Sequence, residues 1–111
     1  MSQAVFSDTF QAEVLGAEEP VLVDFWATWC APCRALAPLI DRIAQQYEGR
    51  AKVVKLDVDK APDVATEYSV QSIPTVVLFQ GGKEKQRWIG GQPLPTYAKA
   101  LDGLLAAAPQ A

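Results

Sequence analysis

Three nearly continuous apolar segments, residues 21–27, 51–58 and 75–80, dominate the hydrophobic pattern of the chain. Runs of this length without regular polar alternation are typical of strands buried on both faces of a sheet. A shorter strand is expected at 4–6. Within the first long run, Asp24 is the only polar residue. The pattern therefore predicts a central sheet with a carboxyl group inside one of its buried strands.

Helical spacing of apolar residues predicts four helices. Asp8 and Gln11 form a capping-box pattern that opens the first helix, and Gly16 closes it. The second helix has the clearest apolar face, and Gly49 ends it. The third and fourth begin near prolines, which the first turn of a helix favours. The four are expected at 8–16, 31–48, 62–68 and from Pro95 onward.

The order of these elements predicts the fold class. Gly81 and Gly82 separate the apolar run 75–80 from a polar strand at 83–89, which predicts a hairpin. Strands alternating with helices before this hairpin imply parallel pairs joined by crossovers. We therefore expect an α/β fold with a mixed five-stranded sheet, flanked by four α-helices and formed as a single domain by residues 1–111.

Composition and charge exclude several functions. Ten basic and 13 acidic residues give a formal charge of -3 and are scattered, so no basic stripe is available to bind nucleic acid. The amino-terminal stretch MSQAVFSDTF lacks the features of a signal peptide, and no apolar run is long enough for a membrane span. We therefore expect a cytoplasmic protein. The chain has no histidine, which excludes mechanisms built on an imidazole base.

The only two cysteines stand in the motif WCAPC, where the first long apolar strand ends and the second helix begins. The first turn of a helix has unpaired N–H groups and partial positive charge, which stabilise an anion. A thiolate at Cys30 is such an anion, and its pKa is expected to lie below that of free cysteine. Pro32 suits this turn because its missing N–H has no cost there.

Cys30 and Cys33 could form a structural disulfide, part of a metal site or a redox pair. Residues three apart on a helix have Cα atoms about 5 Å apart, within the range of a disulfide. A ring this small stabilises a fold by only roughly 2 kcal/mol, which disfavours a structural role. Two thiolates without histidine complete no tetrahedral zinc shell, so a metal would need ligands from a second chain. The spacing favours a pair that opens and closes.

Trp29-Cys30-Ala31-Pro32-Cys33, preceded by Asp24-Phe25-Trp26-Ala27 and followed by Ile73-Pro74-Thr75 and Gly90, resembles the thioredoxin family. The resemblance extends from about Phe6 to Leu105, and this cysteine motif is a well-known mark of thioredoxin-like redox proteins. Three positions depart from the usual pattern. Ala31 replaces a glycine, Arg34 a lysine and Gly91 an alanine. Because the residues between the cysteines tune the reduction potential, Ala31 leaves a more oxidising role as an alternative.

The resemblance implies a monomeric protein disulfide reductase. Cys30 would attack a disulfide of a client protein, and Cys33 would resolve the mixed disulfide. Pro32 would tune the dithiol. A flavin-dependent thioredoxin reductase would restore the pair with electrons from NADPH, so the chain itself needs no bound cofactor. A binding or scaffold role, with incidental thiols, remains an alternative.

Asp24 and Lys55 are further candidates. Burial should raise the pKa of Asp24, which suits a proton shuttle near neutral pH. By the resemblance, Asp24 helps to deprotonate Cys33, and Lys55 lies near it and modulates it. The structural alternative is a buried ion pair between the two.

The resemblance also implies a client-binding rim around Cys30. Pro74 would follow a cis peptide bond, and the backbone of Ile73 would pair with an extended client segment. Glycine at 90 and 91 would let another backbone approach closely. The full set of candidate binding residues is Trp29, Ala31, Ile73, Pro74, Thr75, Gly90 and Gly91.

Overall fold

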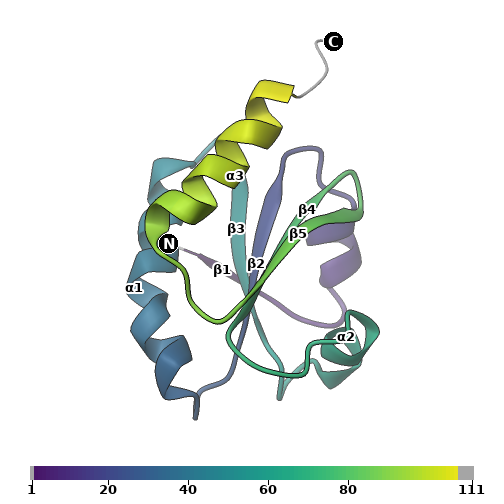
Figure 1. Cartoon of the computed structure of the whole chain (residues 1–111). Helices are drawn as coiled ribbons and strands as arrows, with labels where there is room; N and C mark the ends of the chain where they lie inside the picture. Colours follow the sequence, from purple (N-terminus) through teal and green to yellow (C-terminus); the bar gives the residue numbers. More distant parts are fainter. Residues whose placement is uncertain (1, 108–111) are drawn as a thin grey trace.

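The computed structural model describes residues 2–107 and arranges them as a mixed sheet with helices on both faces (Figure 1). The strands are β1 (Gln3–Val5), β2 (Val21–Trp26), β3 (Lys52–Asp57), β4 (Thr75–Gln80) and β5 (Lys83–Ile89). The helices are η1, a short π-helix (Gln11–Leu15), α1 (Ala31–Gln46), α2 (Pro62–Glu67) and α3 (Leu94–Ala107). The order of elements expected from the hydrophobic pattern is confirmed.

The sheet has the strand order β1-β3-β2-β4-β5. β1 and β2 each pair with β3 in parallel, whereas β4 pairs antiparallel with both β2 and β5. The expected five-stranded mixed sheet is therefore confirmed. β2 lies at its centre, between a parallel and an antiparallel neighbour, and its carboxyl end leads into the cysteine motif.

The alternation of side chains along β2 divides the core into two layers. Val23 and Phe25 pack with η1 and α2 residues on one face of the sheet, and Leu22 packs with α1 and α3 residues on the other. In Figure 1, α1 and α3 cover one face, and α2 covers the opposite face. Because strand side chains alternate, Asp24 lies on the same face as Leu22, beneath α1. This parity brings its carboxyl group to the helix that begins at the cysteines.

The hairpin between β4 and β5 forms as predicted. Gly81 and Gly82 have φ angles of 62° and 77°, both in the left-handed region that two-residue hairpin turns require. Glycine adopts this region without the steric cost of a side chain.

The prediction for the first helix was wrong in two respects. It is a π-helix rather than an α-helix, because the Gly16 N–H donates to the Gln11 carbonyl five residues earlier, at 2.8 Å. No capping box forms at Asp8. Instead, the Phe6 N–H donates to Oγ1 of Thr9, at 2.9 Å. Phe10, directly before η1, is buried in the core on the η1 and α2 face of the sheet.

β4 and β5 have the predicted boundaries, and the ends of the remaining elements other than η1 differ from the predictions by at most two residues, as is common at helix and strand ends. α1 ends at Gln46 instead of residue 48, and Tyr47 caps it. Among the helices within residues 2–107, none combines the length and the apolar character needed to cross a membrane.

Candidate active site

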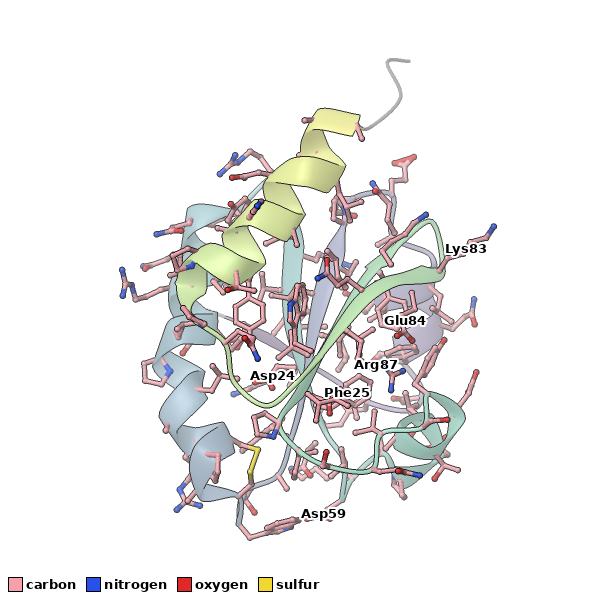
Figure 2. All side chains as sticks on the ribbon, in the orientation of Figure 1. Asp24, Phe25, Asp59, Lys83, Glu84 and Arg87 are labelled. Carbon is pink, nitrogen blue, oxygen red and sulfur yellow. A yellow bond between two sulfur atoms is a disulfide. The ribbon has the colours of Figure 1, made fainter. Side chains whose placement is uncertain are left out.

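Cys30 and Cys33 form a disulfide at the start of α1 (Figure 2). Their Cα atoms are 5.2 Å apart, as the helical spacing predicted. Cys30 is the N-cap residue of α1, with extended backbone angles, and the Cys33 N–H donates to its Sγ at 3.2 Å. Pro32 stands in the first turn, where no N–H is needed. The sulfur of Cys30 therefore accepts a hydrogen bond from one of the N–H groups that have no partner within the helix.

The two sulfur atoms have different surroundings. Both cysteines are nearly buried, at 4% exposure for Cys30 and 1% for Cys33. Trp29, directly before Cys30, is 66% exposed, whereas Cys33 lines a cavity beneath α1 together with Asp24. Sγ of Cys30 lies 3.8 Å from the carbonyl oxygen of Ile73. Cys30 is thus the sulfur nearer the apolar surface, and Cys33 is the sulfur nearer the buried carboxyl group.

Trp29 is held in place by a hydrogen bond that the sequence did not reveal. Its indole Nε1 donates to Oδ2 of Asp59 at 2.7 Å, although both side chains are exposed. Asp59 follows the carboxyl end of β3, and its own N–H donates to Asp57. Because the two partners are 30 residues apart, only the parallel pairing of β2 and β3 brings them together.

The residues expected at the rim divide by exposure. Trp29, Ala31 and Gly91 are exposed, and Ile73 and Gly90 are half-buried. The Ile73–Pro74 peptide bond is cis, as the resemblance implied. The remaining two are buried: Pro74, and Thr75 at 1% exposure.

Thr75 stabilises the loop before β4 and is not part of the exposed rim. Its hydroxyl donates to the Ser72 carbonyl at 2.6 Å, so its side chain does not face the rim. Ile89, which pairs with Thr75 in the sheet, is 67% exposed and was not singled out from the sequence. Residues 83–87 are polar, and the apolar pair Trp88-Ile89 at the end of the strand is the signal that was available.

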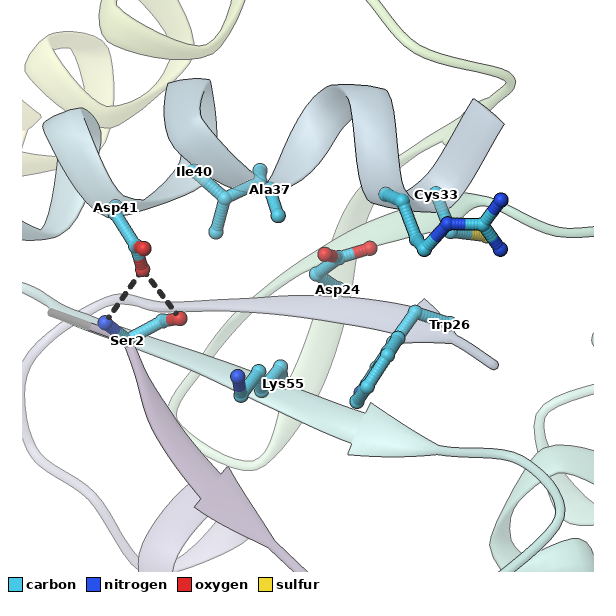
Figure 3. Close-up of a pocket in the computed structure, with 9 residues that line it drawn as sticks. Ser2, Asp24, Trp26, Cys33, Ala37, Ile40, Asp41 and Lys55 are labelled. Atoms are coloured by element: carbon cyan, nitrogen blue, oxygen red, sulfur yellow. Dashed lines mark hydrogen bonds between the residues drawn. The ribbon is translucent and has the colours of Figure 1, made fainter. Parts of the chain in front are cut away.

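A cavity of about 130 Å³ lies between α1 and the sheet (Figure 3). Its lining residues are Ser2, Asp24, Trp26, Cys33, Arg34, Ala37, Ile40, Asp41 and Lys55. Figure 3 shows Asp24 between α1 and β3, with Asp41 farther along α1 and Ser2 opposite Asp41, just before β1. The Ser2 N–H and hydroxyl donate to Oδ1 of Asp41 at 3.1 and 2.9 Å. Neither residue was expected from the sequence, because only the folded chain brings its amino terminus to α1.

Asp24 is 4% exposed, and its Oδ1 has no hydrogen-bond partner within residues 2–107. Burial raises the pKa of Asp24 to about 7; Lys55 opposes this rise, and Asp41 adds to it. The carboxyl group is therefore poised to gain or lose a proton near neutral pH.

Lys55 pairs with Asp24 in the register of β2 and β3. Its ammonium group lies 5.3 Å from the centre of the Trp26 ring, an arrangement typical of a cation–π interaction. Neither ion pair within the described residues involves Lys55, so the predicted alternative of a direct ion pair with Asp24 does not form there. Lys55 acts on Asp24 through its field.

Within residues 2–107, histidine, cysteine, aspartate and glutamate side chains form no group of three or more that could hold a metal ion.

Comparison with known proteins agrees with this arrangement. A family model described as thioredoxin matches residues 2–102. The chain is 50% identical to Thioredoxin 1 of Nostoc sp. over 98 residues. This alignment covers 88% of this chain and 92% of that protein. It is 50% identical over 97 residues to the thioredoxin of Synechocystis sp., with 87% and 91% covered.

A chloroplast relative is almost as similar. Over 102 residues the chain is 48% identical to the M-type chloroplastic thioredoxin of Chlamydomonas reinhardtii, covering 92% of this chain and 73% of that protein. These matches span the sheet, the helices and the cysteine motif together. The chain therefore belongs to the thioredoxin family, as a thiol-disulfide oxidoreductase that reduces protein disulfides through its own Cys30–Cys33 pair without a bound cofactor.

Proposed function

We propose that Cys30 is the attacking nucleophile and Cys33 the resolving thiol. In the reduced protein, the Cys30 thiolate attacks one sulfur of a client disulfide, and the other client sulfur leaves as a thiolate and takes up a proton. Cys33 then attacks Sγ of Cys30, which releases the second client sulfur and restores the Cys30–Cys33 disulfide. The client gains two electrons and two protons.

The observation that carries this assignment is the hydrogen bond from the Cys33 N–H to Sγ of Cys30 at the start of α1. An N–H directed at this sulfur stabilises the negative charge of the Cys30 thiolate that attacks the client disulfide. Cys33 has a different requirement, because it must lose its own proton inside the protein before it can attack.

Asp24 is the proposed acceptor of the Cys33 proton. Both residues line the same cavity, and the carboxyl group has a pKa of about 7. A base with such a pKa is matched to proton transfer near neutral pH. Lys55 modulates Asp24 because its positive charge favours the carboxylate. Pro32 tunes the pair by fixing the first turn of α1.

The proposed client site is the apolar rim around Cys30. An extended client segment pairs with the backbone of Ile73, whose carbonyl lies close to Sγ of Cys30. Trp29, Ala31 and Gly91 offer exposed contacts beside it, and Ile89 extends this surface along β5. Pro74 and Thr75 shape the loop from within, and Gly90 ties it to β5 because its N–H donates to the Pro74 carbonyl at 2.8 Å.

The proposed partners are client proteins with accessible disulfides and a flavin-dependent thioredoxin reductase that draws electrons from NADPH. The chain is proposed to act as a monomer, as one domain formed by residues 1–111, in the cytoplasm. The similarity to thioredoxins of Nostoc sp. and Synechocystis sp. supports the proposal of a reductase and client proteins as partners.

Reduction of insulin tests the proposal directly. With thioredoxin reductase and NADPH, the parent protein should turn over insulin, and neither Cys30→Ser nor Cys33→Ser should do so. Cys33→Ser should instead accumulate a mixed disulfide with the client, visible by mass spectrometry, because its nucleophile is intact and its resolving thiol is absent. Turnover by either variant would overturn the assignment of roles.

A further inference from the structure

Arg87 joins β5 to the end of α2. Its guanidinium group donates to the carbonyl oxygens of Tyr68 and Ser69 at 2.6 and 3.4 Å, and to both carboxylate oxygens of Glu84 at 2.8 Å each. Figure 2 shows Arg87 and Glu84 on the side of β5 that faces α2. The carbonyl groups at the end of a helix lack intrahelical partners, and Arg87 supplies donors to two carbonyls just beyond α2.

A bulge in β5 makes this contact possible. Leu78 pairs with Gln86 and Phe79 with Glu84, so Lys85 is an extra residue in the ladder. In a regular strand, residues three apart point to opposite faces. The extra residue shifts this parity and places Glu84 and Arg87 on one face, where the carboxylate orients the guanidinium in a bidentate contact.

The carbonyls that Arg87 holds begin the loop that leads to the active site. Ser69 has a φ of 56°, in the left-handed region, and turns the chain away from α2. Four residues later, the Ile73 carbonyl lies 3.8 Å from Sγ of Cys30. Two hydrogen bonds fix the far end of the loop. The Thr75 hydroxyl donates to the Ser72 carbonyl, and the Gly90 N–H donates to the Pro74 carbonyl. Gln71 and Ser72, between the two ends, are exposed.

We propose that Arg87, oriented by Glu84, is a positioning residue that fixes the near end of the loop 69–73 and so presents the Ile73 backbone to protein clients. The inference rests on the proposed docking of clients at Ile73. Backbone pairing requires a segment held in one conformation before the client arrives, because ordering it on binding would weaken the affinity. A small disulfide that forms no strand pairing does not depend on this preorganisation.

The test compares two substrates, insulin and bis(hydroxyethyl) disulfide. In Arg87→Gln, kcat/KM for insulin should fall about fivefold relative to kcat/KM for the small disulfide, mainly through KM, as expected for the loss of hydrogen bonds from a charged group. Arg87→Lys and Glu84→Gln should give smaller falls, because each keeps part of the contact. Lys83→Gln, which removes the same charge from an exposed residue of the same strand outside the bulge, is the matched control and should leave the ratio unchanged.

Hydrogen exchange supplies the structural readout. Amide protons of Val70, Gln71 and Ser72 should exchange faster in Arg87→Gln than in Lys83→Gln. An unchanged ratio of the two substrates, an equal loss for both, or unchanged exchange in this loop would overturn the positioning role.

A separate measurement isolates the docking proposal. In the mixed disulfide of Cys33→Ser with a client peptide, the Ile73 amide should be protected from exchange. If the Ile73 amide is protected but the ratio of the two substrates is unchanged in Arg87→Gln, client docking at Ile73 stands and only the role of Arg87 is rejected. If the Ile73 amide is not protected, both client docking at Ile73 and the role of Arg87 are rejected.

Discussion

Asp24 and Lys55 are directly paired in the parallel register of β2 and β3, yet Lys55 directs its ammonium group to the Trp26 ring rather than into an ion pair with the carboxyl group. The buried carboxyl group therefore lacks the close partner that would keep it charged at neutral pH. The folded protein favours the protonated form of Asp24. Ionising Asp24 lowers the stability of the fold, because it leaves a charge in a poorly solvated place.

Asp24→Asn should stabilise the protein at high pH. The folded-state pKa of about 7 lies above the ordinary value of 3.8, so the protonated carboxyl group contributes stability that is fully present below about pH 4 and is lost as the pH rises to about 7. The two values correspond to about 4 kcal/mol. The asparagine amide is itself buried without a hydrogen-bond partner within residues 2–107, so the substitution recovers only part of this free energy. We expect the free energy of unfolding to rise by roughly 2 kcal/mol at about pH 8. Denaturant unfolding at a series of pH values measures it.

At about pH 4, where Asp24 is neutral in the folded protein, the same substitution should give little or no gain. Glu19→Gln is a suitable control, because Glu19 is exposed and does not line the cavity. A gain from Asp24→Asn that is equal at both ends of the pH range would contradict a raised pKa as its cause.

The same substitution should slow the second step of the reaction. Without a proton acceptor beside Cys33, the attack of Cys30 on the client continues while resolution lags. In a single-turnover experiment with an excess of reduced protein, Asp24→Asn should form the mixed disulfide at the parent rate and release the client about tenfold or more slowly near pH 7. Equal release rates would make Asp24 a structural residue.

Lys55 and Asp41 should move the pKa of Asp24 in opposite directions. Lys55 lowers it and Asp41 raises it, so Lys55→Met should raise the pKa of Asp24 and Asp41→Asn should lower it. The other charged group that lines the cavity is Arg34 on α1, and Arg34→Gln provides a comparison on the same helix. A titration of the Asp24 side-chain carboxyl carbon by NMR measures each pKa. Shifts in the same direction for Lys55→Met and Asp41→Asn would exclude the field of these charges as the cause.

Much of the fold follows from local patterns in the sequence. The buried strands read as apolar runs because both of their faces are covered, and the Gly81-Gly82 turn admits few alternatives to a hairpin. The first helix could not be predicted in detail. The sequence shows a capping-box pattern at Asp8, whereas in the structure the Phe6 N–H donates to Thr9 and Phe10 packs into the core, a tertiary contact that no local pattern reveals.

The candidate site was only partly predictable for a similar reason. Cys30, Cys33 and Asp24 stand out because their chemistry is rare in their local context. Asp41, Asp59 and Arg87 look like ordinary charged residues in the sequence. Their partners are 39, 30 and up to 19 residues away, so their roles depend on the tertiary arrangement. The Lys85 bulge, which gives Arg87 its direction, also has no local signature.

Gly90 and Gly91 should respond differently to alanine. Gly90 has a φ of 88°, where a side chain is strained, so Gly90→Ala should cost about 1–2 kcal/mol. In Gly91→Ala, the added Cβ would lie 3.4 Å from Leu36 Cδ1, an ordinary contact at a backbone angle that alanine tolerates. We expect Gly91→Ala to be neutral or slightly stabilising, because alanine restricts the unfolded chain. Thermal unfolding of the two variants measures the difference, and equal melting temperatures would contradict it.

Tyr47 should anchor α3 to the end of α1. Its hydroxyl donates to Oδ1 of Asp102 at 2.7 Å, and burial together with this carboxylate raises its pKa to about 12. Tyr47→Phe removes the bond and keeps the ring, so it should lower the free energy of unfolding by about 1–2 kcal/mol. Tyr68→Phe is the matched control, because the Tyr68 ring makes its contacts with Phe10 and Phe79 at centroid distances of 5.5 and 5.3 Å. Denaturant unfolding compares the two, and an equal loss in both variants would mean that the Asp102 bond adds nothing to the docking of α3.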